Sequence, residues 1–207
     1  MKLKQFLKTG TSLALALTLM FGLCWNVNAE TEAISEQLKA EYYADYQQIA
    51  SEVSSSTGKE ISVISFDEFN DSDWVSPDEF RNLALEFANL KLEVVPNDFS
   101  VRSTGSKTKS VSITAAGLTD TLYITGSFET QYSSFHDRQL FAGVNSITSS
   151  LSSSSNGTWS QIGYDYSGLD GLRTYYVTVS GQYIRAGLAT NLYASVYFYC
   201  SPTGGIS

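Results

Sequence analysis

The residues from Leu192 to Cys200 alternate strictly between apolar and hydroxylated side chains. The apolar set is Leu192, Ala194, Val196, Phe198 and Cys200, and the hydroxylated set is Tyr193, Ser195, Tyr197 and Tyr199. Successive side chains of a β-strand point to opposite faces, so this period of two predicts a strand. We expect the first face, with the Cys200 thiol, to lie in a core and the aromatic face to lie at the surface.

The chain before this strand repeats the same pattern, with turn residues between short segments. Strands are predicted at 110–115, 122–129, 139–151, 158–166 and 172–180, with a turn at 117–120 and a turn or short strand at 181–188. The apolar parity slips between Val144 and Ile147, which predicts a β-bulge. Asn156-Gly157 predicts a hairpin, and Asp170-Gly171 predicts a second turn. Six or seven such strands indicate an antiparallel β-sandwich or a barrel-like sheet.

The first third of the chain has the period of helices instead. Apolar residues at three- and four-residue steps predict a helix over 30–53, ended by Ser54–Gly58, and a short strand follows at 60–66. Ser76-Pro77-Asp78-Glu79 combines an N-cap serine, a first-turn proline and a glutamate at the third position, which is a capping box. We expect a second helix from there to Pro96, packed on the first. The predicted fold class is therefore α+β: a helix–strand–helix unit and then the β domain.

Charge divides the chain in the same way. Residues 30–98 carry 16 acids and 4 bases, whereas residues 99–207 carry 5 acids and 6 bases. This asymmetry predicts an acidic helical unit at 30–98, a linker or exposed first strand at 99–109, and a Ser/Thr/Tyr-rich antiparallel β domain at 110–207. No Lys/Arg cluster is present to neutralise phosphates, so nucleic acid is not an expected partner.

Residues 1–29 have the three parts of a secretory signal peptide. Lys2, Lys4 and Lys8 precede an apolar run, and Val27-Asn28-Ala29 places small residues where a signal peptidase reads. We expect cleavage after Ala29 and a secreted, extracellular protein, with a pattern typical of small exported bacterial proteins. Cleavage would leave Cys200 as the sole cysteine, so the fold must hold without an internal disulfide.

One loop has the oxygen ligands that hard cations prefer. It contains Asp67, Glu68, Asn70, Asp71 and Asp73. A calcium loop also needs a glycine at its sharp turn and a bidentate glutamate at its far end, and both are missing. We interpret the segment as a solvated loop before the second helix and expect no metal site.

The chain holds one histidine, His136, between two predicted strands. A nucleophilic serine normally sits in a recognisable elbow, and no such motif is present. A single imidazole also cannot supply the two or three ligands of a catalytic zinc. We therefore expect no catalytic residues and no cofactor, and we interpret the protein as non-enzymatic.

Tyrosine is concentrated in the β domain, since ten of the thirteen tyrosines follow Asp98. Exposed rings beside hydroxyl groups can stack on sugars or anchor a protein, although tyrosine also fills sheet surfaces because of its β propensity. We expect Tyr176, Tyr193, Tyr197 and Tyr199 to be the ligand-binding residues of an interaction module. The expected partner is carbohydrate, cell wall or protein, and the oligomeric state is left open.

An alternative function follows from the charge division. The acidic helical unit could be a removable pro-region of a secreted toxin or antimicrobial effector, and only this alternative involves a membrane. An intact-mass measurement that finds only the species starting at Glu30 would remove its main support.

Overall fold

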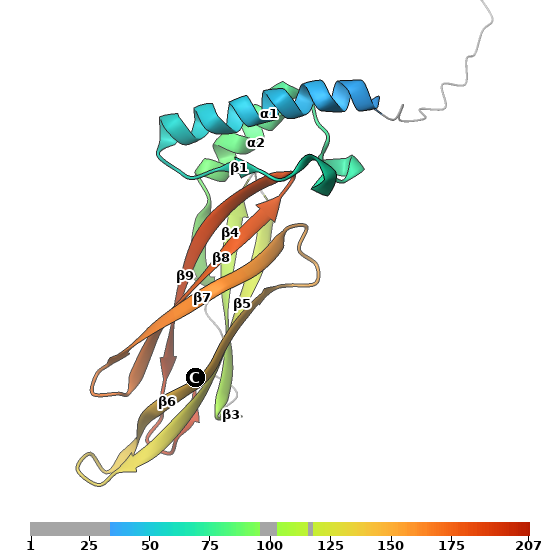
Figure 1. The fold of residues 1–207 in the computed structure, drawn as a ribbon. Coiled ribbons are helices and arrows are strands. Elements are labelled where there is room, and N and C mark those ends of the chain that lie inside the picture. Colours follow the sequence, from blue (N-terminus) through green and yellow to red (C-terminus); the bar gives the residue numbers. More distant parts are fainter. Residues whose placement is uncertain (1–33, 96–102, 116–117) are drawn as a thin grey trace, which may run out of the picture. The chain divides into compact units, whose positions relative to one another are not determined.

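The computed structural model describes residues 34–95, 103–115 and 118–207, and residues 34–207 belong to one compact unit. Two helices are followed by two four-stranded antiparallel sheets (Figure 1). The fold class predicted from the sequence, helices followed by an antiparallel β domain, is confirmed. The predicted signal peptide at 1–29 lies outside the described residues.

One sheet combines a strand that precedes the strands of the other sheet in the chain with three strands that follow them. The first sheet is ordered β1 (Ser62–Val63), β9 (Leu188–Tyr199), β8 (Thr174–Arg185) and β7 (Thr158–Leu169). The second is ordered β2 (Lys91–Val95), β4 (Ser106–Ala115), β5 (Leu118–Ser133) and β6 (Arg138–Leu151). A two-residue pair joins β3 (Ser103–Thr104) to β10 (Gly205–Ile206). The helical segment therefore contributes one short strand to each sheet.

The inner faces of the sheets meet in an aromatic layer. Phe128 on β5 lies 4.8 Å from Phe198 on β9, and Phe141 on β6 stacks on Tyr175 of β8 at 4.3 Å between ring centroids. The apolar set of β9 behaves as its alternation predicts, with Val196 and Phe198 fully buried and Cys200 only 3% exposed. Full burial of such side chains contributes about 1.5–3 kcal/mol each, so this layer is a main source of stability.

The helices lie across one end of the sheets (Figure 1). α1 (Glu36–Thr57) and α2 (Pro77–Ala88) pack together, with Tyr46 stacked on Phe80 at 3.8 Å. Between them the chain makes two 3₁₀ turns, η1 (Phe66–Glu68) and η2 (Asp71–Asp73). Phe87 of α2 stacks on Tyr183 of β8 at 5.6 Å, which joins the helices to the sheet core.

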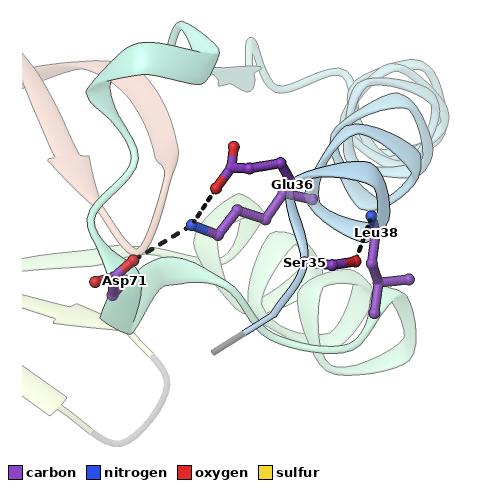
Figure 2. Close-up of polar contacts among 5 residues, drawn as sticks. Ser35, Glu36, Leu38 and Asp71 are labelled. Carbon is purple, nitrogen blue, oxygen red and sulfur yellow. Dashed lines mark hydrogen bonds and ion pairs between the residues drawn. The ribbon is translucent and has the colours of Figure 1, made fainter. Parts of the chain in front are cut away.

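Helix boundaries follow local capping. The predicted box at Ser76 is confirmed, because the Ser76 hydroxyl accepts from the Glu79 N–H and the Glu79 carboxylate accepts from the Ser76 N–H. α1 begins later than predicted, at Glu36, because the Ser35 hydroxyl accepts from the Leu38 N–H (Figure 2). It also runs on through the serines to Thr57 and ends at Gly58, whose φ of 68° is the left-handed conformation that glycine adopts without strain.

The second helix was predicted to reach Pro96, and this is wrong. It ends at Ala88, and Lys91–Val95 forms β2, which pairs along β4 from Ser110 to Thr114. Val94 and Val95 are β-branched and favour a strand, and the open edge of β4 supplies hydrogen bonds that a helix there would forgo. The strand predicted at 60–66 is shorter in the structure and covers only Ser62–Val63, because the chain turns into η1 at Phe66.

The predicted hairpin at Asn156-Gly157 is also wrong. β6 and β7 belong to different sheets, so this segment crosses from one sheet to the other. The glycine is needed for space, because a Cβ at Gly157 would lie 2.6 Å from Tyr183 Cε2 and 2.9 Å from Asp120 Oδ2.

Two further turns are displaced from their predicted positions. Gly181 does not end a strand: β8 continues to Arg185, and the glycine makes room for the Trp159 ring. Leu172 lies in a turn rather than in β8, with a φ of 65°, and β5 begins at Leu118 inside the predicted turn at 117–120. The predicted bulge is confirmed, because the β5–β6 register skips Asn145 between Val144 and Ser146.

Candidate binding face

Tyr176, Tyr193, Tyr197 and Tyr199 lie on the outer surface of β8 and β9, and we call them the tyrosine face. Tyr197 pairs with Tyr176 across the two strands, with ring centroids 5.0 Å apart. Tyr199 follows along β9, 6.4 Å from Tyr197 and inclined to it by 21°. Tyr193 is 68% exposed, and Tyr197 and Tyr199 are 47% and 44% exposed.

Hydroxyl groups fill the positions between these rings. Thr178 and Ser195 are paired across β8 and β9 and share a hydrogen bond of 2.8 Å, and Ser180 lies opposite Tyr193. The distance from Tyr193 to Tyr199 is six residues, about 20 Å at the rise of a strand. The face is therefore an elongated row of rings with polar groups between them, fixed by the backbone pairing underneath.

A cation from the other sheet reaches one end of this row. Lys109 of β4 places its Nζ 5.9 Å from the centroid of the Tyr199 ring, a cation–π distance. Burial lowers the pKa of the Lys109 ammonium, and the charge of Lys107 lowers it further. The sequence assigned Lys109 to the linker at 99–109, and no local signal connects it with Tyr199.

The sequence also missed a buried polar cluster at the helical end of the sheets. Asp120, 3% exposed, accepts from the Tyr183 hydroxyl at 2.7 Å, from the Arg185 guanidinium at 3.0 Å and from the Asn156 N–H at 3.3 Å. Burial, followed by the bond to Asp120, raises the pKa of Tyr183 to about 12. Every polar partner in this cluster is occupied, so we assign it a structural role. The sequence did hold one signal of this cluster, because Asp120 occupies a position of its strand where the alternation predicts an inward, apolar side chain.

The acidic loop forms caps and an ion pair. Glu68 accepts from the Ser65 N–H and Asp73 from the Asn70 N–H, each at the start of a 3₁₀ turn. Asp71 lies 3.4 Å from Lys39 Nζ, which also contacts Glu36 at 3.1 Å (Figure 2). Across the described residues, no group of three or more His, Cys, Asp or Glu side chains is placed to hold a metal ion.

The remaining candidates lie apart from the tyrosine face. His136 is exposed in the turn between β5 and β6, with its ring 4.8 Å from that of Phe135. Cys200 is buried, and desolvation raises the pKa of its thiol, which disfavours the reactive thiolate. The burial of Cys200 agrees with the core position that the alternation of its strand predicts.

Two open depressions mark the surface elsewhere. One, of about 490 Å³, lies between α1 and the β1 segment and is lined by Gln47, Ser51 and Glu60 among others. The other, of about 410 Å³, lies beside the β5–β6 turn and includes Tyr132 and Leu172. Neither includes a residue of the tyrosine face.

Among the described residues, no helix has both the length and the apolar character needed to span a membrane. No protein-family model, curated protein or solved structure matches the chain.

Proposed function

We propose that this protein is a secreted or cell-surface, non-enzymatic module that binds an extended polysaccharide along the tyrosine face. The observation that carries the proposal is the row of half-exposed rings on β8 and β9, with Tyr197 and Tyr199 nearly parallel at 6.4 Å. Aromatic faces stack on the apolar faces of sugar rings, while the neighbouring hydroxyls donate to and accept from sugar hydroxyls.

The shape of the face favours a polymer over a small ligand. Small molecules are usually held in concave pockets that bury most of their surface. A flat row about 20 Å long, built from a strand, offers several equivalent contacts in a line instead. Each contact is weak, and affinity grows as more units of one chain are engaged together.

The test is depletion of the purified 30–207 chain, which contains the whole compact unit, by insoluble cell-wall material and polysaccharides. A variant with Tyr197→Ala and Tyr199→Ala should bind at least about tenfold more weakly, since an aromatic contact contributes about 0.5–1.5 kcal/mol beyond its area. Tyr123→Ala is the matched control, because Tyr123 is 40% exposed on β5 of the other sheet.

Equal retention of the double variant and the native chain would refute the proposal. Retention on none of the polysaccharides would also refute it, and capture of a defined protein through the same tyrosines would then favour a protein partner. An unchanged melting temperature in the double variant confirms that the loss reflects binding, because both side chains point away from the core.

A further inference from the structure

Lys109 occupies an unusual position for a residue of β4. It pairs with Ile124, which is fully buried, so its side chain starts on the inner face of the second sheet. Its ammonium nevertheless lies over Tyr199, on the outer face of the first sheet. The described pairing of β2 with β4 runs from Ser110 to Thr114, and Lys109 is the residue of β4 just before it.

Within the described part of the chain no ion pair includes Lys109, and its ammonium is partly desolvated. Arg138 adds positive charge nearby, since its guanidinium donates to the Cys200 carbonyl, one residue beyond Tyr199, at 2.7 Å. A partly desolvated cation without a counterion is stabilised when an anion binds it.

Two acids lie beside the face on the β7 side, and the main chain of Ser207 pairs with that of Tyr199 at the edge of β9. Asp165 is paired with Thr178 on the β7 side, and Asp170 accepts from the Thr174 hydroxyl at 2.9 Å in the β7–β8 turn. Arg173 lies in the same turn as Asp170. Lys109 approaches Tyr199 from the β4 side, so an anionic group beside this ring would bind at Lys109.

The acidic helices do not cancel the charge of Lys109. They adjoin β9 at Leu188, where β1 pairs with it, and Tyr199 is at the other end of that strand. Eleven residues of strand separate the two positions by about 36 Å. The Debye length at physiological ionic strength is about 8 Å, so the helical charge is screened at Lys109.

We propose that the polysaccharide is anionic, and that its carboxylate or phosphate groups bind Lys109 while its sugar rings stack on Tyr197 and Tyr199. This inference rests on the proposed function and names its ligand class. It makes Lys109 a specificity residue, which separates charged from neutral polymers with the same backbone.

The test compares polygalacturonate with the same polymer after methyl esterification, and a teichoic acid with a neutral glucan, by affinity electrophoresis of the 30–207 chain. The native chain should bind an anionic polymer about tenfold more tightly than its neutral counterpart at low salt, and the difference should shrink as salt rises. Preference for polyuronate alone would identify carboxylate as the group bound, and preference for teichoic acid alone would identify phosphate.

Lys109→Gln should remove the preference and leave binding of the neutral polymer intact, whereas Lys109→Arg should keep it. Lys59→Gln is the charge-matched control, because Lys59 is exposed just after α1. Equal binding of charged and neutral polymers by the native chain, or an unchanged preference in Lys109→Gln, overturns this inference and leaves the proposed function standing. Binding of no polymer at all overturns both.

Discussion

Replacement of Asp120 by alanine should destabilise the protein strongly. The variant leaves the Arg185 guanidinium, whose side chain is 11% exposed, without its carboxylate partner. Breaking a buried ion pair on one side costs about 3–5 kcal/mol, because an uncompensated charge remains. The Tyr183 hydroxyl and the Asn156 N–H lose their acceptor as well. Because these groups belong to the same network, their contributions are not additive, and the total loss stays within the same range.

The expected loss is therefore about 4 kcal/mol, which corresponds to a fall in melting temperature of about 8–16 °C for a domain of this size. Urea unfolding followed by tyrosine and tryptophan fluorescence measures the free energy, and calorimetry measures the temperature. Glu129→Ala is the matched control, because it removes an exposed acid from the same strand and should change stability by less than about 0.5 kcal/mol.

A second substitution tests the cause. Asp120→Ala combined with Arg185→Met removes both charges, so the double variant should be more stable than Asp120→Ala alone by about 1 kcal/mol or more. A loss below about 1 kcal/mol in Asp120→Ala, or a strictly additive double variant, would refute the argument that this pair joins β5 to β8.

Three further predictions follow from burial. Burial raises the pKa values of Tyr46 and Tyr183 to about 12 from 10.0, so both residues stabilise the fold below pH 10. The free energy of unfolding should therefore fall as the pH rises toward 12. Unfolding followed as a function of pH, together with ultraviolet titration of the tyrosines, checks this. Cys200 should react with a thiol reagent only after denaturation, and rapid labelling of the native chain would contradict its burial. The isolated segment 103–207 lacks β1, β2 and Phe87, so it should aggregate or melt well below the 30–207 chain, and a soluble, equally stable fragment would favour a removable N-terminal region.

Features set by neighbouring residues were predictable. The Ser76 cap, the burial pattern of Leu192–Cys200 and the bulge at Asn145 each depend on a few residues, whose geometry is the same in any fold. The alternation placed the tyrosine face at the surface because the same strand had to bury its other face. Local chemistry and burial acted in the same direction at these positions.

Features set by distant partners were not predictable. Lys91–Val95 became a strand because β4 offered an open edge, and Asn156-Gly157 crossed between sheets because the glycine packs against Tyr183 and Asp120. Lys109 was placed in a linker because nothing near it in the sequence indicates Tyr199, ninety positions later. A single sequence encodes such contacts only through three-dimensional packing, which periodicity does not report.

One face of β9 packs in the core and the other carries the exposed tyrosines, and this difference makes the binding proposal testable. Ala194, Val196 and Phe198, each 0–1% exposed, fix the strand against both sheets, so the spacing of the outward rings is set before any ligand arrives. A preorganised face loses little conformational entropy on binding, which favours affinity for a ligand held on an open sheet surface. Because the outward tyrosines contribute little to the core, their substitution should change affinity and leave stability nearly constant. Inward substitutions should reduce stability first, and any loss of binding should follow from that.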